Sequence, residues 1–83
     1  MSKDRREVRL TRHAAERAYG FNLSPADVEK IIADGQRIVE GKRKARYVLK
    51  TKDSVLVAIC EESAERVDVI TITKGKGGGK RDG

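Results

Sequence analysis

The sequence predicts an α+β domain in which two N-terminal helices pack on one face of a four-stranded antiparallel sheet. Up to Gly35 the apolar residues recur at spacings of three and four, which is the period of a helix. From Gln36 onward they alternate with polar residues and are enriched in β-branched types, which is typical of strands. Because the helices come first and the strands follow in a block, we expect one layer of helices on an antiparallel sheet. A chain of 83 residues holds one small core, which we place in residues 1–74.

The two helices are predicted over residues 11–20 and 25–34. The apolar side chains of the first lie on one stripe: Leu10, Ala14, Ala18 and Phe21. Thr11 suits the N-cap of the first helix, and Ser24 suits that of the second because a proline follows it at the first helical position. Gly35 follows the last apolar turn, where a left-handed residue commonly ends a helix.

Four strands are predicted where the alternation is clearest: Arg37–Glu40, Ala45–Thr51, Ser54–Cys60 and Arg66–Thr73. The third is apolar on both faces and is therefore expected at the centre of the sheet. In the second, Arg46 and Lys50 share one face, while Tyr47 lies on the other with apolar neighbours. We therefore expect a basic open face and a buried Tyr47.

The positive charge of the chain is concentrated in one segment. The formal net charge is +6, and residues 42–52 carry six basic residues and no acidic one. A run of one sign attracts polyanions, because each neutralised phosphate releases counterions. We therefore expect a nucleic acid as the partner and assign nucleic-acid contacts to Arg12, Lys42, Arg43, Lys44, Arg46 and Lys50. The alternative is a basic surface that serves solubility alone.

The composition excludes several classes of protein. One cysteine and one histidine cannot build a structural zinc site, and the single Cys60 cannot form an intramolecular disulfide. No apolar stretch approaches the roughly 18 residues that a membrane span needs. We therefore expect a cytoplasmic protein that uses no metal or cofactor and contacts no membrane. Residues 75–83 lack apolar side chains and are predicted to form a disordered basic tail rich in glycine and lysine.

His13 and Arg17 are the first candidates for chemistry. They are four residues apart and are therefore neighbours on the first predicted helix, at the rim of its apolar stripe. A histidine in this position can accept or release a proton, and an adjacent guanidinium can stabilise the negative charge of a phosphate. The alternative is a histidine that packs or caps locally at the boundary of the core.

Three segments carry a resemblance to a known group of domains. They are Thr11–Arg17 (TRHAAER), Leu23–Val28 (LSPADV) and Val69–Thr73 (VITIT). Together they resemble small bacterial and archaeal domains of unknown function that open with an H-A-x-x-R helix and are grouped with RelE-like toxins, barnase, EndoU and the colicin ribonucleases. The resemblance implies a RelE-like fold, RNA held on the sheet face, and metal-independent cleavage by attack of the ribose 2′-hydroxyl on the adjacent phosphate. The chain departs from that pattern at residues 19–22, where those domains usually carry a second arginine.

The resemblance also assigns candidate catalytic residues. His13 and Arg17 match the histidine and arginine of those domains, and Thr71 or Thr73 matches the polar residue of their last strand. Cleavage further needs a proton donor for the leaving oxygen, which Tyr47 can supply if it is not a core residue. The candidate catalytic residues are therefore His13, Arg17, Tyr47 and Thr73.

Three interpretations of the function stay open at this point. The first is a toxin-like, metal-independent endoribonuclease. The second is a noncatalytic RNA- or DNA-binding module, which the missing second arginine favours. The third is an interaction module, monomeric or homodimeric, whose basic surface meets an antitoxin-like protein or which pairs through a sheet edge.

Overall fold

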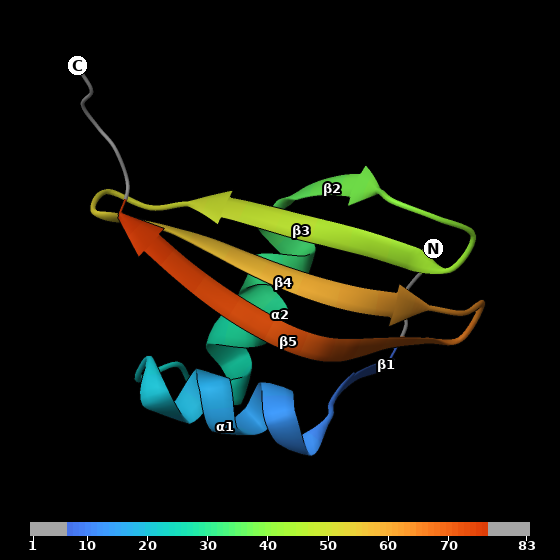
Figure 1. Ribbon diagram of the computed structural model, residues 1–83, viewed down its shortest axis with the longest axis horizontal. Coiled ribbons are helices and arrows are strands. Elements are labelled where there is room, and N and C mark those ends of the chain that lie inside the picture. Colours follow the sequence, from blue (N-terminus) through green and yellow to red (C-terminus); the bar gives the residue numbers. More distant parts are fainter. Residues whose placement is uncertain (1–6, 77–83) are drawn as a thin grey trace.

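The computed structural model describes residues 7–76, which form five strands and two helices (Figure 1). In chain order the elements are β1 (Glu7–Leu10), α1 (Arg12–Gly20), α2 (Pro25–Asp34), β2 (Gln36–Val39), β3 (Lys44–Lys50), β4 (Ser54–Glu62) and β5 (Arg66–Lys76). The strands form one sheet in the order β1-β5-β4-β3-β2, with β4 at the centre as predicted. Strand β1 pairs with β5 in parallel, and the other neighbours are antiparallel. Neither helix of this part of the chain has the length and apolar character that a membrane crossing requires.

The predicted arrangement of two N-terminal helices on a four-stranded antiparallel sheet is wrong. The sheet has five strands and is mixed, and the helices lie between β1 and β2 rather than both at the N-terminus. The RelE-like arrangement that the resemblance implies is therefore incorrect as well. The error lies in β1, whose four side chains alternate between exposed and half-buried. Leu10 also fits the apolar stripe of the first helix. A strand of only four residues therefore cannot be told apart from the start of the helical pattern.

Both helices begin at the predicted N-caps. Thr11 Oγ1 accepts a hydrogen bond from Ala14 N (3.1 Å), and Ser24 and Asp27 form a capping box at the start of α2. Hydrogen bonds from Ser24 hold the pKa of Asp27 below its ordinary value. The bond from the Ser24 backbone has the larger effect, and the bond from its side chain has the smaller one. The side chains that α1 buries are Ala14 and Ala18, whose small size lets the helix lie close to β5.

Gly35 ends α2, but not in the left-handed conformation that the sequence predicts, because its φ is −74°. This position needs a glycine for space instead. A Cβ atom here would lie 2.4 Å from the carbonyl oxygen of Ile31 and 3.0 Å from that of Val48. The bare backbone therefore lets the end of α2 pass directly against β3. The left-handed conformation occurs at Asn22 (φ 61°), in the turn between the helices, where asparagine is tolerated.

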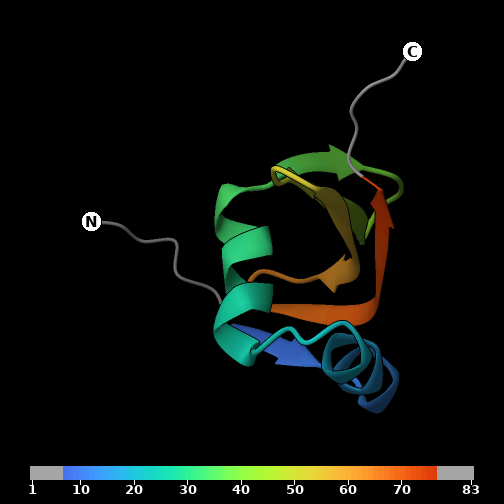
Figure 2. The same ribbon diagram turned by 90° about the vertical axis from the view of Figure 1, so that its left-hand side faces the viewer.

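Strand β5 contains a β-bulge at Ile70. The register between β4 and β5 shifts by one residue between Ile59 and Cys60, which leaves Ile70 as the extra residue. Because of this residue Val69 and Ile72 are both buried, whereas a regular strand would place them on opposite faces. Figure 2 shows that β5 bends along its length and that the sheet curls around the core, with α2 on its inner side.

The core lies between the concave face of the sheet and the helices. Its buried members are Ala14, Ala18, Val28, Ile31, Ala45, Tyr47, Leu56, Ala58, Cys60, Val67, Val69 and Ile72. Tyr47 is 3% exposed, which confirms the expectation that it is buried. The opposite face of the sheet, which we call the open face, is turned toward the viewer in Figure 1, with α2 behind the sheet. Its central side chains are Lys44, Arg46, Val48, Lys50, Val55, Val57, Ile59, Thr71 and Thr73.

Strand β5 extends two residues beyond the predicted domain boundary at residue 74. The strand continues through Gly75 and Lys76, which pair with Val55 and Ser54 of β4. These two residues belong to the segment 75–83 that is predicted as a tail. The remainder of that segment, residues 77–83, lies outside the described part of the chain, so its predicted disorder stays a prediction.

Candidate functional site

The candidate site lies where α1 runs along the edge of β5. Strand β1 pairs with β5 as far as Val69, so beyond that point the carbonyl groups of β5 that do not face β4 are directed toward α1. Thr11 Oγ1 donates a hydrogen bond to the carbonyl oxygen of Ile70 (3.1 Å), and Arg17 Nε donates one to that of Ile72 (3.2 Å). These side chains cover the free edge of β5 and hold α1 against it.

Arg17 is held at two points but keeps most of its hydrogen-bonding capacity. Its Nε atom bonds to Ile72, and its guanidinium carbon lies 5.2 Å from the centre of the Phe21 ring. Within residues 7–76 its two terminal nitrogens have no hydrogen-bond or ion-pair partner, and the side chain is exposed. Because these nitrogens carry most of the guanidinium N–H donors, Arg17 can bind two oxygens of one phosphate.

His13 and Thr73 lie beside Arg17 along the same edge. His13 is exposed and precedes Arg17 by one helical turn, so the two side chains are neighbours on α1. Thr73 is exposed and follows Ile72, the residue whose carbonyl group holds Arg17. Thr71 is half-buried on the same face. The structure therefore places three of the four candidate catalytic residues at one edge of the sheet, while their catalytic roles stay predictions.

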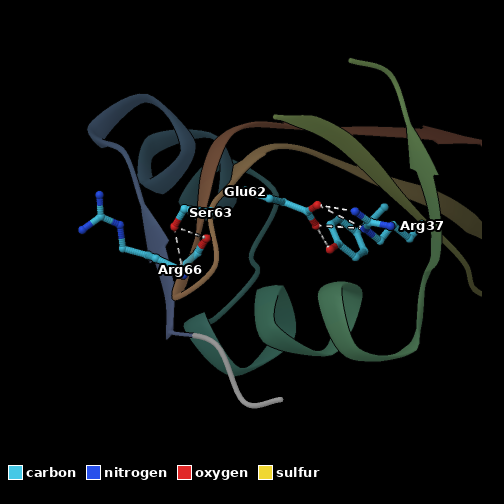
Figure 3. Close-up of polar contacts among 5 residues, drawn as sticks. Arg37, Glu62, Ser63 and Arg66 are labelled. Atoms are coloured by element: carbon cyan, nitrogen blue, oxygen red, sulfur yellow. Dashed lines mark hydrogen bonds and ion pairs between the residues drawn. The ribbon is translucent and has the colours of Figure 1, made fainter. Parts of the chain in front are cut away.

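Tyr47, the fourth candidate, lies apart from the other three. It is buried on the helix-covered face of the sheet, and its hydroxyl donates a hydrogen bond to Glu62. Arg37 binds the same carboxylate through Nε and Nη2, with 2.6 Å between Nη2 and Oε1 (Figure 3). The hydrogen bond to Glu62 is the main reason that the pKa of Arg37 is raised. Because Tyr47 and Thr73 belong to opposite faces, Tyr47 does not join the group at the α1–β5 edge.

The six residues predicted to contact nucleic acid are divided among three places. Arg12 begins α1. Lys42 and Arg43 lie in the β2–β3 loop. The other three lie on the open face of β3: Lys44, Arg46 and Lys50. Arg46 forms an ion pair with Glu40, and the other five have no ion-pair partner within residues 7–76. Arg46 shares a cross-strand row with Ile59 and Thr71, so two strand spacings, about 10 Å, separate its backbone from that of Thr71.

The structure gathers no group of three His, Cys, Asp or Glu side chains in residues 7–76 that could hold a metal ion. Cys60 is fully buried in β4, and its Sγ atom lies 3.8 Å from the carbonyl oxygen of Ala58. It is therefore a packing residue of the core.

Sequence reasoning missed the roles of two polar residues, Thr11 at the α1–β5 edge and Glu62 beside Tyr47. Thr11 is identifiable as an N-cap, but its bond to Ile70 depends on the unpredicted pairing of β1 with β5. Glu62 lies beyond the end of the predicted strand Ser54–Cys60, although it belongs to β4 and its side chain is 9% exposed. Its alternation with Ala58 and Cys60 was the signal that it faces the core, where a carboxylate needs hydrogen-bond donors.

Comparison with protein families matches residues 10–74 to the family described as Domain of unknown function (DUF4258). Because the match covers most of the 83 residues, the chain belongs to this family. The matched segment includes both helices and the strands β2, β3 and β4 in full. Comparison with curated proteins found no match, and comparison with solved structures found none either. Nothing in these comparisons links the chain to RelE-like toxins or to barnase.

Proposed function

We propose that this member of the family described as Domain of unknown function (DUF4258) is a small RNA-binding domain whose central phosphate contact is Arg17. The observation that carries the proposal is the guanidinium of Arg17, which Ile72 and Phe21 hold in place while its terminal nitrogens stay open to a ligand. A planar guanidinium that is already positioned binds two phosphate oxygens with little further loss of side-chain entropy.

The surroundings of Arg17 favour a polyanion over a ligand with a single phosphate. His13 lies on one side of Arg17, and further basic side chains follow across the open face: Lys44, Arg46 and Lys50. Among the three aromatic residues, Tyr19 alone is largely exposed. Because stacking on bases needs exposed aromatic rings, we expect contacts mainly with phosphates and little dependence on base sequence.

Binding of a fluorescent single-stranded RNA over a salt series tests this proposal. The Arg17→Gln variant removes the charge but keeps an N–H donor for the Ile72 carbonyl group. Its matched control is Lys30→Gln, which removes one charge from the exposed side of α2. We expect Arg17→Gln to weaken binding by about five-fold or more and to lower the salt slope by about 0.7, the value for one phosphate contact on a single strand. Equal effects of the two variants would contradict the proposal.

His13 supports a second function at the same site, which is metal-independent cleavage of the bound RNA. In this reaction His13 takes the proton of the ribose 2′-hydroxyl as the 2′-oxygen attacks phosphorus. The bond from phosphorus to the 5′-oxygen breaks, and water supplies the proton that this leaving oxygen needs. Arg17 stabilises the charge on the nonbridging oxygens, and the exposed hydroxyl of Thr73 offers a further hydrogen bond. The H-A-x-x-R helix, on which a relation to RelE-like toxins depends, supports this candidate.

Incubation of labelled RNA with the purified chain in EDTA tests the cleavage separately from the binding. Cleavage by this route leaves fragments that end in a 2′,3′-cyclic phosphate, and these fragments should disappear in the His13→Ala variant but persist in Lys30→Gln. RNA that stays intact while the wild-type chain binds it would assign the site to binding alone. Fragments that persist in His13→Ala would show that another group accepts the proton.

A further inference from the structure

We propose that two copies of this chain associate through β2, the strand at the free edge of the sheet. The proposal is independent of RNA binding. Within residues 7–76 the exposed large apolar side chains are Tyr19, Ile38 and Val39, and two of these three lie in β2. Ile38 is 40% exposed and Val39 is 60% exposed. An edge strand that carries exposed apolar side chains is a template for a further strand.

The opposite edge of the sheet is protected in two ways. Strand β1 presents the charged side chains of Glu7 and Arg9 to solvent. Beyond the end of β1, Thr11 and Arg17 occupy the carbonyl groups of β5. Charges and a covering helix are the usual means by which an edge avoids pairing. Strand β2 has no covering helix, and its one charged side chain, Arg37, is paired with Glu62, so the two edges differ in their protection against association.

The hydrogen bonds of the β2–β3 hairpin show which main-chain groups of β2 face outward. Glu40 N donates to Lys44 O at 2.8 Å, which makes these two residues a hydrogen-bonded pair. Such pairs alternate with non-hydrogen-bonded pairs along antiparallel strands. Following the register, Ile38 also bonds to β3, whereas Arg37 and Val39 direct their N–H and C=O groups to the free edge.

A two-fold axis perpendicular to the sheet at Ile38 uses all of these outward groups. Antiparallel pairing about this axis places Ile38 opposite Ile38 of the second copy, and Arg37 opposite Val39 of the second copy. Each Arg37–Val39 pair then exchanges both of its main-chain hydrogen bonds. The central Ile38 pair is a non-hydrogen-bonded pair, whose Cα atoms approach to about 4.5 Å. The open faces of the two copies join into one continuous surface.

The charges near this edge favour a second copy as the occupant. Arg37 is neutralised by Glu62, and Arg46 is neutralised by Glu40, so these side chains bring little repulsion to the interface. The same pairing brings the exposed Lys42 of the β2–β3 loop toward the end of α2 in the second copy. That end carries the exposed Asp34, whose charge is opposite to that of Lys42.

The small size of the contact sets the expected strength. Two strands of four residues bury less than the roughly 1,200 Å² at which stable interfaces begin. We therefore expect a reversible dimer with a dissociation constant on the order of 100 µM.

Cysteine cross-linking of the full chain tests the register. In the Ile38→Cys variant the two sulfurs lie within bridging distance across the axis, whereas in Val39→Cys the diagonal separation of the two Cα atoms exceeds the limit of about 7 Å. We expect mild oxidation to link most of Ile38→Cys and little of Val39→Cys, although Val39 is the more exposed residue. The wild-type chain, whose cysteine is buried, gives the background. Equal or faster linking of Val39→Cys would overturn the proposed pairing.

Sedimentation equilibrium between about 10 µM and about 1 mM tests the association itself without a covalent link. Because Ile38 lies opposite Ile38 of the second copy, Ile38→Lys places two like charges side by side and should weaken the dimer ten-fold or more, while Val39→Lys lies opposite the neutralised Arg37 and should weaken it by less than about three-fold. A wild-type chain that stays monomeric at the highest concentration would overturn the proposal. Equal weakening by both variants would also overturn it, since an unspecific apolar contact would lose at least as much from a charge at Val39, the more exposed residue.

Discussion

Replacing Thr11 by valine tests how α1 is held at the edge of β5. The hydroxyl of Thr11 accepts a hydrogen bond from Ala14 N at the start of α1 and donates one to the carbonyl oxygen of Ile70. Valine has nearly the same shape but lacks the hydroxyl, so Thr11→Val loses both bonds. Loss of the N-cap costs about 1 kcal/mol. Loss of the bond to Ile70 costs about 1 kcal/mol more, so we expect a decrease of about 2 kcal/mol in the free energy of unfolding.

A decrease of this size is easily measured in a domain whose total free energy of unfolding is about 5–10 kcal/mol. Urea unfolding followed by circular dichroism should show a lower midpoint at an unchanged m-value. The melting temperature should fall by roughly 8–16 °C. The matched control is Thr11→Ser, which keeps the hydroxyl and should stay within about 0.5 kcal/mol of the wild type. A loss in Thr11→Val below that value, or an equal loss in Thr11→Ser, would refute the reasoning.

Three further predictions concern stability and the sequence-based site. Gly35→Ala should lose about 1–3 kcal/mol of unfolding free energy in urea, because its Cβ would lie 2.4 Å from Ile31 O; a more stable variant would contradict this. Hydrogen bonds from Ser24 hold the pKa of Asp27 below its ordinary value of 3.8, so ionised Asp27 stabilises the fold above that pH, and the contribution is lost as the pH falls through the lowered pKa. The difference in unfolding free energy between wild type and Asp27→Asn should therefore narrow as the pH is lowered from about 5 to about 2.5, and a constant difference would count against it. Tyr47→Phe should lose about 1–3 kcal/mol, because Glu62 loses a hydroxyl donor, yet bind RNA within about two-fold of the wild type; weaker binding at unchanged stability would return Tyr47 to the site.

The helices and four of the strands were predictable because their signals are local. Thr11 and Ser24 mark the helix starts by their own side chains, and strands β2 to β5 begin within one residue of their predicted positions. The layout of the sheet was not predictable in the same way. Strand β1 is four residues long, and the partner that stabilises it is far away in sequence. A stripe that includes Leu10 fits a helix and a strand equally well until that pairing is known.

The candidate site shows the same division between local and long-range information. The neighbourhood of His13 and Arg17 follows from helical spacing alone. The restraint on Arg17 does not, because it depends on the carbonyl group of Ile72, whose orientation depends on the bulge at Ile70. The apolar alternation of this strand changes phase between Val69 and Ile70, two apolar residues in succession, but this pattern alone does not distinguish a bulge from a strand that is apolar on both faces. Burial of Tyr47 was predictable from its parity with Ala45, which argued against its catalytic role from the start.

The most direct test of the account is an NMR titration of the ¹⁵N-labelled chain with a short single-stranded RNA of mixed sequence. It observes the Nε–H group of Arg17 together with the main-chain amides. If Arg17 at the α1–β5 edge is the centre of an RNA-binding surface, its Nε–H signal and the amides of residues 70–73 should shift most. Smaller shifts should follow along β3, and those of α2 should be negligible. Shifts confined to α2, or none at concentrations where the RNA is bound, would contradict the central claim.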